Sequence, residues 1–476
     1  MKIKKFISLS LIGLLLFLSS GCDWLKKKTT TTTNPEVITL NYYKLFDDED
    51  VFTPILQKFQ SKYPHIRINY KKFNDFDEYN SLILNEMAEG EGPDIFSVQN
   101  TWIAKNTKKL TPAKLTLITP ELAEQAFVDV AAKDVLHYDQ KDGLKKMFGV
   151  PLTVDTLALY YNKSHFEDAL PEKGAPSATW EGLKEDVYRL TKKDNSFERF
   201  FRSGIALGRS ENISRSVDIL YLMMLQYKVD FYNKDYNEAA FAKATGIPPT
   251  TPAADALDLY TSFALQSNKN YSWNKYIASE SNPEKELDAF VSGKLSMFVS
   301  YSYAYEQVMD LIKTKRAAGI DTIKETSVRV APAPQVFDPK VSPDKRTAYA
   351  NYFVEVVSRT SKHPDEAWLF LSFLASKESN QHYFDKTHKP TSRRDLIEEQ
   401  AKEPIYGVFV NQIGYAESFA IYDRELYIDV FKQAIDAVIA TGNPTSAIKN
   451  AERLISDLLP GKGFIPLPPP KPPVNN

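Results

Sequence analysis

Strand-like and helix-like patterns of apolar residues alternate near the start of the chain. Residues 37–42, 66–70 and 95–98 are short apolar or alternating runs, which are typical of strands with one or both faces buried. Residues 52–59 and 82–87 instead carry apolar side chains at helical spacing. The order strand, helix, strand, helix, strand predicts a doubly wound α/β sheet.

The first of these helices has recognisable end signals. Thr53 is a residue type favoured at a helix N-cap, and Pro54 suits the first helical position because it has no backbone donor to leave unpaired. Pro64 follows the last apolar position and cannot continue a helix. The sequence therefore predicts a helix that starts near Pro54 and ends before Pro64.

Helical patterns dominate the rest of the chain. Asp142-Gly143 is a tight-turn pair, and the segment 157–161 that comes later alternates as a strand does. Further short strands are expected near 296–300, 328–331 and 352–357. We expect helices at 180–190, 213–226, 253–265, 283–291, 364–375, 423–439 and 445–459.

The N-terminus has the features of an exported lipoprotein. Three lysines among the first five residues precede a mostly apolar run at 6–18, which suits a signal-peptide core and is short for a membrane span. The sequence Leu-Ser-Ser-Gly-Cys, ending at Cys22, resembles a bacterial lipobox, in which the cysteine is diacylated and becomes the first mature residue. We therefore expect a lipoprotein signal peptide at 1–21 and a lipid on Cys22. The alternative is an ordinary cleaved signal followed by a chance Gly-Cys pair.

Both ends of the mature chain predict segments outside the folded body. Residues 22–35 contain three lysines and a run of five threonines, with little to bury, and read as a flexible tether. Residues 461–476 form a proline-rich tail. Since Cys22 is the only cysteine, no disulfide can form within the chain, and packing must hold the fold.

Composition and charge exclude some functional classes. Apolar residues make up 43% of the chain, which is ample for large cores. The formal net charge is −2, and removal of residues 1–21 takes away three lysines and no acids, which leaves about −5. This balance gives no basic field for nucleic acid. After residue 18 no apolar run is long enough to cross a membrane.

Four segments together resemble the type 1 extracellular solute-binding proteins of ABC importers, the family that includes maltose-binding protein. They are Tyr-Pro-His-Ile at 63–66, Gly-Pro-Asp-Ile-Phe at 92–96, the stretch from Asp-Gly at 142–143 through Gly-Val-Pro at 149–151 to Leu-Tyr-Tyr-Asn-Lys at 159–163, and Gly-Lys-Leu-Ser-Met at 293–297 with Ala-Pro-Ala-Pro at 331–334. Their order and spacing also fit, over about residues 36–460.

The resemblance implies an α/β fold with two lobes, the type II fold of periplasmic binding proteins. Each lobe would be a mainly parallel sheet flanked by helices, with hinge crossovers between the lobes. Carried onto this sequence, lobe one covers 36–152 plus 353–402, and lobe two covers 153–352 plus 403–460. A ligand would lie in the cleft between the lobes, and closure would bury it.

The same resemblance implies a receptor function. We expect a lipid-anchored protein on the extracytoplasmic face of the cell membrane, acting as a monomer, that binds a small molecule and delivers it to ABC permease subunits powered by a separate ATPase. A sugar or oligosaccharide is the expected ligand. Two alternatives stay open: a lipid-anchored carbohydrate-active enzyme, and a sensor or adhesin that keeps the fold without transport.

Two family-like blocks supply candidate ligand-binding residues. Asp155 follows the Gly-Val-Pro crossing, where a family carboxylate often faces the cleft. The place where the family often carries a sugar-stacking tryptophan falls on Tyr303, and Tyr301 has the same two-residue phase. Carboxylates bind sugar hydroxyls and aromatic rings cover sugar C–H faces, so we expect Asp155 and Tyr303 to face a ligand across the cleft.

Two more segments supply the other candidates. Asn100, Thr101 and Trp102 follow the strand at 95–98, and ligands of open α/β sheets bind beyond the carboxyl ends of strands. Tyr415 and Glu417 fall where the family has hinge and cleft residues late in the chain.

Sequence motifs give no support for an enzyme or a metal protein. The six histidines are scattered without a His-x-x-x-His pair, and no second cysteine is present. The chain has no Gly-x-Ser-x-Gly elbow and no Walker loop. We therefore expect no catalytic residues, no metal site and no cofactor.

Overall fold

The computed structural model describes residues 37–194, 199–277 and 285–467. The predicted signal peptide, the tether and the lipid on Cys22 lie outside these residues, as does the tail beyond residue 467. Within the described ranges, no helix has the length and apolar character needed to cross a membrane.

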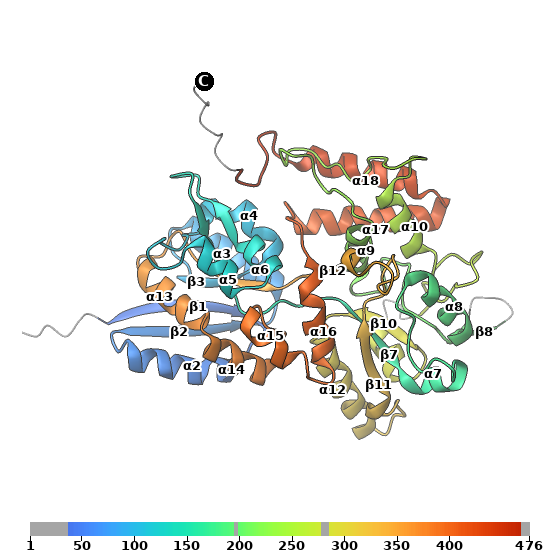
Figure 1. The fold of residues 1–476 in the computed structure, drawn as a ribbon. Coiled ribbons are helices and arrows are strands. Elements are labelled where there is room, and N and C mark those ends of the chain that lie inside the picture. The colour runs from blue at the N-terminus through green and yellow to red at the C-terminus, as the bar shows by residue number, and fades with distance from the viewer. Residues whose placement is uncertain (1–36, 195–198, 278–284, 468–476) are drawn as a thin grey trace, which may run out of the picture.

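The first lobe is built on a five-stranded sheet in the order β2-β1-β3-β13-β6. Its strands are β1 (Ile38–Leu45), β2 (Ile66–Phe73), β3 (Ile95–Gln99), β13 (Phe353–Val357) and β6 (Val150–Pro151). Strands β1, β2 and β3 are parallel, as the alternating pattern predicts, whereas β13 runs antiparallel to both of its neighbours. The helices α2 (Glu49–Lys62) and α14 (Lys377–Thr387) lie on one face of the sheet, and α3 (Phe76–Ala88) and α4 (Ile103–Asn106) lie on the other (Figure 1).

The predicted start of α2 is wrong by one turn. The helix begins at Glu49, with Asp48 as its N-cap, and Pro54 lies inside it. Thr53 does not cap the helix; its hydroxyl donates to the carbonyl of Glu49, 3.0 Å away. Glu49 and Asp50 add negative charge to the first turn, which favours this earlier start.

A buried ionic cluster joins three strands of the first lobe. The ammonium of Lys44 on β1 lies 2.5 Å from the carboxylate of Glu355 on β13, and both residues are almost fully buried. The hydroxyl of Ser97 on β3 donates to the other Glu355 oxygen at 2.9 Å. Because the buried charges have direct partners, the cluster ties together the strands whose ends carry the candidate site.

The second lobe is built on a smaller sheet in the order β10-β7-β11. Its strands are β7 (Ala158–Asn162), β10 (Met297–Ser300) and β11 (Val328–Pro332). Both pairings are antiparallel, so the expectation of a mainly parallel sheet in this lobe is wrong. The reason is the direction of the chain in each strand: β7 runs away from the hinge, whereas β10 and β11 run back toward it.

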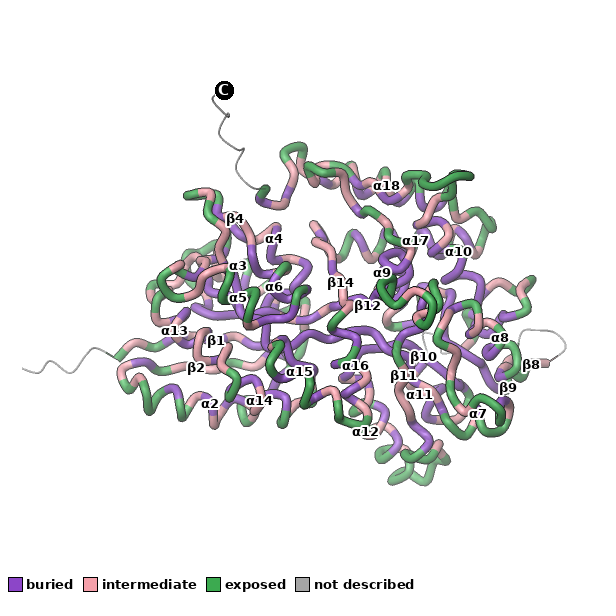
Figure 2. The backbone as a smooth tube through the Cα atoms, in the orientation of Figure 1, coloured by how far each residue is buried: buried purple, intermediate pink, exposed green. Residues whose placement is uncertain are grey.

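The remaining helices of the second lobe pack into one large core around this sheet. The helices α9 (Ser216–Gln226), α10 (Pro252–Thr261), α17 (Arg424–Thr441) and α18 (Pro444–Leu458) form one group beside it (Figure 1). Others are α7 (Lys163–Ala169), α8 (Trp180–Leu190), α11 (Lys285–Val291) and α12 (Ala304–Ala317). Figure 2 shows buried backbone running through the middle of both lobes, with exposed residues concentrated on the outer helices.

The chain passes between the two sheets three times. Residues 152–157 connect β6 to β7, and residues 333–352, which include β12 (Ala348–Tyr349), connect β11 to β13. The third passage runs from α13 (Pro364–Leu374), α14 and α15 (Arg394–Gln400) through α16 (Tyr406–Gln412) and β14 (Ala416–Glu417) to α17. A bridge between Thr156 and Ala350 and the parallel pair β12–β14 hold these passages together as a hinge.

Candidate functional site

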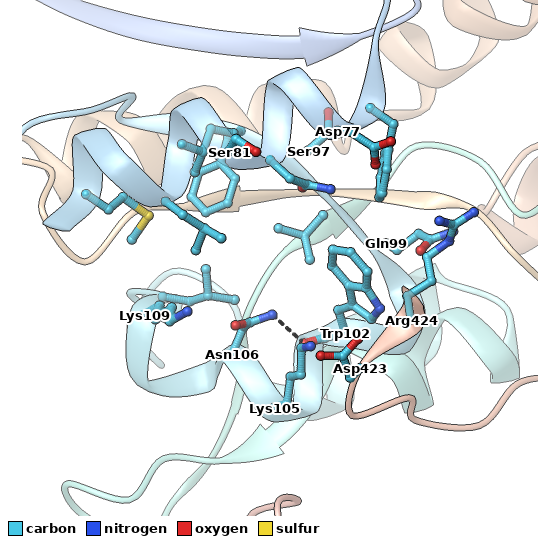
Figure 3. A pocket seen from close by; sticks show the side chains of 18 of the residues that line it. Asp77, Ser81, Ser97, Gln99, Trp102, Lys105, Asn106, Lys109, Asp423 and Arg424 are labelled. Carbon is cyan, nitrogen blue, oxygen red and sulfur yellow. Dashed lines mark hydrogen bonds between the residues drawn. The ribbon is translucent and has the colours of Figure 1, made fainter. Parts of the chain in front are cut away.

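A pocket of about 320 Å³ lies where the first lobe meets the start of α17 (Figure 3). Its walls come from α3, from β3, from the short helix η2 (Asn100–Trp102) with α4, and from residues 423–425. The end of β3 and the start of α17 are separated by more than 300 residues in sequence. Most of the lining belongs to the first lobe, and Asp423, Arg424 and Glu425 add a contribution from the second.

Several contacts close the two lobes around this pocket. The backbone N–H of Ile421 donates to the carbonyl of Thr101 at 2.9 Å, and the ammonium of Lys105 donates to the carbonyl of Tyr422. The guanidinium of Arg424 lies 5.1 Å from the centre of the Phe76 ring, which is a cation–π arrangement. Thus the segment before α17 lies directly against the loop that follows β3.

Two buried polar atoms of the pocket residues have no hydrogen-bond partner among the described residues. They are the indole Nε1 of Trp102 and the Oε1 of Gln99. The Gln99 amide is oriented by its other end, since Nε2 donates to Oδ1 of Asn351 at 3.0 Å. A buried group without a partner costs about 1–3 kcal/mol, so this donor and this acceptor are candidates for pairing with a ligand.

Charges at the pocket are balanced in number. Asp77, Asp423 and Glu425 line it together with Lys105, Lys109 and Arg424. Arg424 donates to the Glu425 carboxylate at 2.7 Å, and burial lowers the pKa of Lys105, with Asp423 opposing that effect. The pocket therefore offers no excess of either sign to a ligand.

Asn100 and Thr101 hold the loop in place. The Asn100 amide donates to Asp134 at 2.8 Å, and its oxygen accepts from the backbone N–H of Tyr352 at 3.2 Å. Asp134 also accepts from Ser418 and Tyr352; burial raises its pKa, and these hydrogen bonds oppose the rise. Thr101 is 4% exposed. The side-chain groups of Asn100 are thus already occupied within the protein.

Asp155 lies in the first hinge passage and is 8% exposed. Its carboxylate accepts from the Ser302 hydroxyl at 2.8 Å, from the Ser302 backbone N–H at 3.1 Å, and from the Thr156 backbone N–H at 2.9 Å. Burial raises the pKa of Asp155 to about 6, and the Ser302 hydrogen bonds oppose the rise. Ser302 precedes Tyr303 in the chain, so the Asp155 carboxylate is bound to the segment that carries Tyr303. The expectation that Asp155 and Tyr303 face a ligand across the cleft stays a prediction.

Tyr303 and Tyr301 lie in a cluster around Arg215, the residue before α9. The guanidinium of Arg215 donates to the Tyr303 hydroxyl at 2.8 Å and lies 5.5 Å from the centres of both rings. Tyr301 is 3% exposed and donates to Asp218 at 3.0 Å. Tyr301 therefore packs in the core of the second lobe, while Tyr303 is partly exposed.

Tyr415 and Glu417 lie at the last hinge passage. The Tyr415 ring lies 4.6 Å from the Arg346 guanidinium, and burial raises the Tyr415 pKa. Glu417 accepts from Lys228 at 2.8 Å and from the Thr347 hydroxyl at 3.2 Å. Neither residue lines the pocket at α3.

Of the eight predicted ligand-binding residues, the pocket includes only Trp102. Sequence reasoning missed Gln99, Phe76 and Arg424. Gln99 ends β3, so the rule that ligands bind beyond the carboxyl ends of strands could have found it. No local signal connects Arg424 with α3. Within the described ranges, no group of three or more His, Cys, Asp and Glu residues could hold a metal ion.

Comparisons with known proteins agree with this architecture. The model of the bacterial extracellular solute-binding protein family matches residues 43–381. A binding protein of Brucella abortus (strain 2308) is 20% identical over 406 residues, which cover 84% of this chain and 87% of the relative.

Solved structures of sugar-binding proteins share the fold. The sugar-binding protein MalE from Xanthomonas citri is 16% identical with a TM-score of 0.68, and the match covers 88% of this chain and 97% of that one. An ABC transporter solute-binding protein from Thermotoga lettingae, bound with α-D-tagatose, is 18% identical with a TM-score of 0.65 over 89% of this chain and 100% of that one. The family match over most of the chain leads to one conclusion: this chain belongs to the bacterial extracellular solute-binding proteins.

Proposed function

We propose that this protein is a lipid-anchored receptor on the extracytoplasmic face of the cell membrane. It binds a neutral carbohydrate in the pocket between α3, η2 and the start of α17, and delivers it to an ABC permease as a monomer. The observation that carries the proposal is the pair of unpartnered buried atoms, Trp102 Nε1 and Gln99 Oε1.

A hydroxyl group is the simplest partner for this pair. A hydroxyl can accept from the Trp102 N–H and donate to the Gln99 oxygen at the same time. The rings of Trp102 and Phe76, whose centres are 5.6 Å apart, supply flat apolar surface for the C–H face of a sugar. The balanced charges of the pocket favour a neutral ligand over an acidic or basic one.

The other predicted residues receive supporting roles in this proposal. Asp155 holds the hinge through Ser302 and Thr156, and Asn100 holds the ligand-binding loop through Asp134. Tyr303, which is partly exposed beside Arg215, becomes a ligand contact only if the ligand extends toward the second lobe. Thr101, Tyr301, Tyr415 and Glu417 contribute packing and hinge contacts.

The anchor and the delivery step rest on the sequence and on the family. A lipid on Cys22, followed by the tether at 22–35, keeps the receptor near the membrane-embedded permease. Family membership supports a binding role, and sugar-binding proteins that share the fold support a carbohydrate ligand.

A thermal-shift screen followed by calorimetric titration tests the proposal. The screen uses neutral saccharides such as tagatose, maltose, maltotetraose and mannobiose; a ligand at 100 times its Kd stabilises the folded state by about 2.7 kcal/mol. Trp102→Ala should weaken binding of any hit at least tenfold, whereas Tyr276→Ala, which removes an aromatic ring that is 64% exposed and lies outside the pocket, should not. Equal binding by wild type and Trp102→Ala would rule this pocket out.

A further inference from the structure

The pocket continues away from Trp102 as a groove along the first lobe. In Figure 3 Gln99, Trp102 and Arg424 gather at one end, and Lys109 lies at the opposite end. Residues of α3, α4 and β3 line the groove between these ends. The groove has an aliphatic part, formed by Ile83, Leu84, Met87, Val98 and Leu110, and it also has the polar residues Asn80, Ser81, Ser97 and Asn106.

This stretch of the groove is poorly suited to a sugar ring. A pyranose carries hydroxyls around its edge, and each of them loses water when it is buried. Polar side chains on this stretch include Asn80, Ser81 and Asn106, and the Asn106 amide already donates to the carbonyl of Trp102 at 3.1 Å. Ile83 and Val98 have no hydrogen-bonding side-chain group, so a hydroxyl placed directly against them would go unpaired, which is unfavourable.

The same stretch is well suited to an apolar group. Ile83 and Val98 are 4% and 7% exposed, so the inner wall is firmly packed, whereas Leu84 is 51% exposed at the rim. An alkyl or aryl group lying here would cover Leu84 and lose no hydrogen bond. Its attachment point would lie next to the donor and acceptor of Trp102 and Gln99, because all of these residues line one continuous pocket.

We infer that the ligand is amphipathic: a neutral hydroxylated head pairs with Trp102 and Gln99, and an alkyl or aryl substituent lies along the groove on Ile83, Leu84 and Val98. The inference rests on the proposed function, because it assumes that the pocket at Trp102 binds the head. It goes further by naming a glycoside with an apolar aglycone, or the glycan end of a lipid, as the class of ligand.

Calorimetric titration with matched pairs tests the inference. Glucose, mannose, galactose and maltose are each compared with their octyl glycosides, all below the critical micelle concentration. We expect at least one octyl glycoside to bind wild type at least tenfold more tightly than its parent sugar. Leu84→Glu should abolish most of that gain by placing a charge at the rim of the groove. The matched control is Leu122→Glu, since Leu122 is a helical leucine that is 53% exposed and lies outside the pocket.

Each outcome separates the inference from the proposed function. If free sugars bind and lose affinity in Trp102→Ala, but no octyl glycoside binds more tightly, the inference fails and the proposed function stands. If the octyl gain is the same in Leu84→Glu as in Leu122→Glu, the chain binds elsewhere and the inference fails. If neither sugars nor octyl glycosides bind, both fail. A gain that Leu84→Glu removes and Leu122→Glu retains supports the inference.

Discussion

At the scale of single residues, Trp102 matters through one N–H group. In the unbound protein this donor is buried without a partner among the described residues, which costs free energy of folding. Under the proposed function, a ligand hydroxyl that pairs with this donor would recover that loss, so Trp102 would lower the stability of the unbound protein and raise the affinity for the ligand. Its ring also packs against Phe76 and lies 4.9 Å from the Lys105 ammonium.

Trp102→Phe separates the contribution of the indole N–H from that of the ring, because it keeps an aromatic ring and removes the N–H. We expect affinity for the ligand to fall about tenfold, equivalent to ~1.4 kcal/mol. The melting temperature of the unbound protein should stay the same or rise, because an unpaired buried donor is removed. Titration and thermal unfolding together check this; a lower melting temperature with unchanged affinity would mean that Trp102 only supports the fold.

Asp155 predicts a pH dependence of stability. Burial raises its pKa from 3.8 to about 6 in the folded protein. Between these values the folded chain holds a proton that the unfolded chain has lost. The stabilisation from this protonation is fully present below about pH 4 and is lost as pH rises through 6. A pKa raised from 3.8 to about 6 corresponds to roughly 3 kcal/mol.

Asp155→Asn removes this contribution, because asparagine does not titrate. The stability difference between wild type and Asp155→Asn should therefore favour wild type more at pH 4 than at pH 7.5. Urea unfolding at the two pH values measures it. A difference that is equal at both pH values would contradict a raised pKa for this carboxyl.

The candidate site was only partly predictable from sequence, because some of its residues follow local patterns and others depend on contacts between distant parts of the chain. Trp102 could be predicted because it follows the carboxyl end of a strand whose apolar pattern is local. Asp155 has the residue type and position of a ligand contact, yet its partners on Ser302 lie almost 150 residues away. Arg424 reaches the pocket through the packing of α17 against the first lobe, which no local pattern encodes.

At the scale of elements, the close pairing of β6 with β13 depends on Gly149, the residue before β6. A Cβ added at Gly149 would lie 2.6 Å from a Val354 methyl and 2.9 Å from the Glu355 carbonyl oxygen. Neither atom belongs to a flexible side-chain end. The glycine thus lets β6, at the edge of the sheet, approach β13 before the chain enters the hinge.

Gly149→Ala should destabilise the protein by about 1–3 kcal/mol through overpacking. Gly414→Ala is the matched control, since a Cβ there meets no atom within 4 Å. Denaturant unfolding of both variants provides the comparison. Equal stabilities would show that β13 can move aside without cost.

The elements themselves were predicted best where their patterns are local. The strands of the first lobe alternate or are apolar throughout, and the closing helices α17 and α18 carry clear helical spacing. The antiparallel strand directions in the second sheet could not be predicted in the same way. They depend on β7 leaving the hinge while β10 and β11 return to it, which is a property of chain connectivity.

At the scale of the whole molecule, the two lobes meet at one hinge of three passages and at the contacts beside the pocket. Beside the pocket, the Ile421–Thr101 and Lys105–Tyr422 hydrogen bonds connect the lobes. An interface of this kind suits a receptor whose lobes separate to admit a ligand and close again around it.

The proposed membrane anchor is a separate property of the whole molecule and would depend on one thiol, that of Cys22. Cys22→Ala should move the protein from the membrane fraction to the soluble extracytoplasmic fraction, because acyl chains attached to that thiol supply the anchor. Ser20→Ala, which leaves the thiol intact, is the control. Unchanged membrane association of Cys22→Ala in cell fractionation would disprove lipidation at this residue.

The central claim is that a carbohydrate binds beside Trp102, and fluorine NMR of protein labelled with 5-fluorotryptophan tests it most directly. The Trp102 signal is assigned from its absence in Trp102→Phe, while Trp180, Trp273 and Trp368, each at most 3% exposed in a core, serve as internal references. On saturation with a saccharide that raises the melting temperature, the Trp102 signal should shift and the three reference signals should move far less. An unchanged Trp102 signal at saturation would contradict the account.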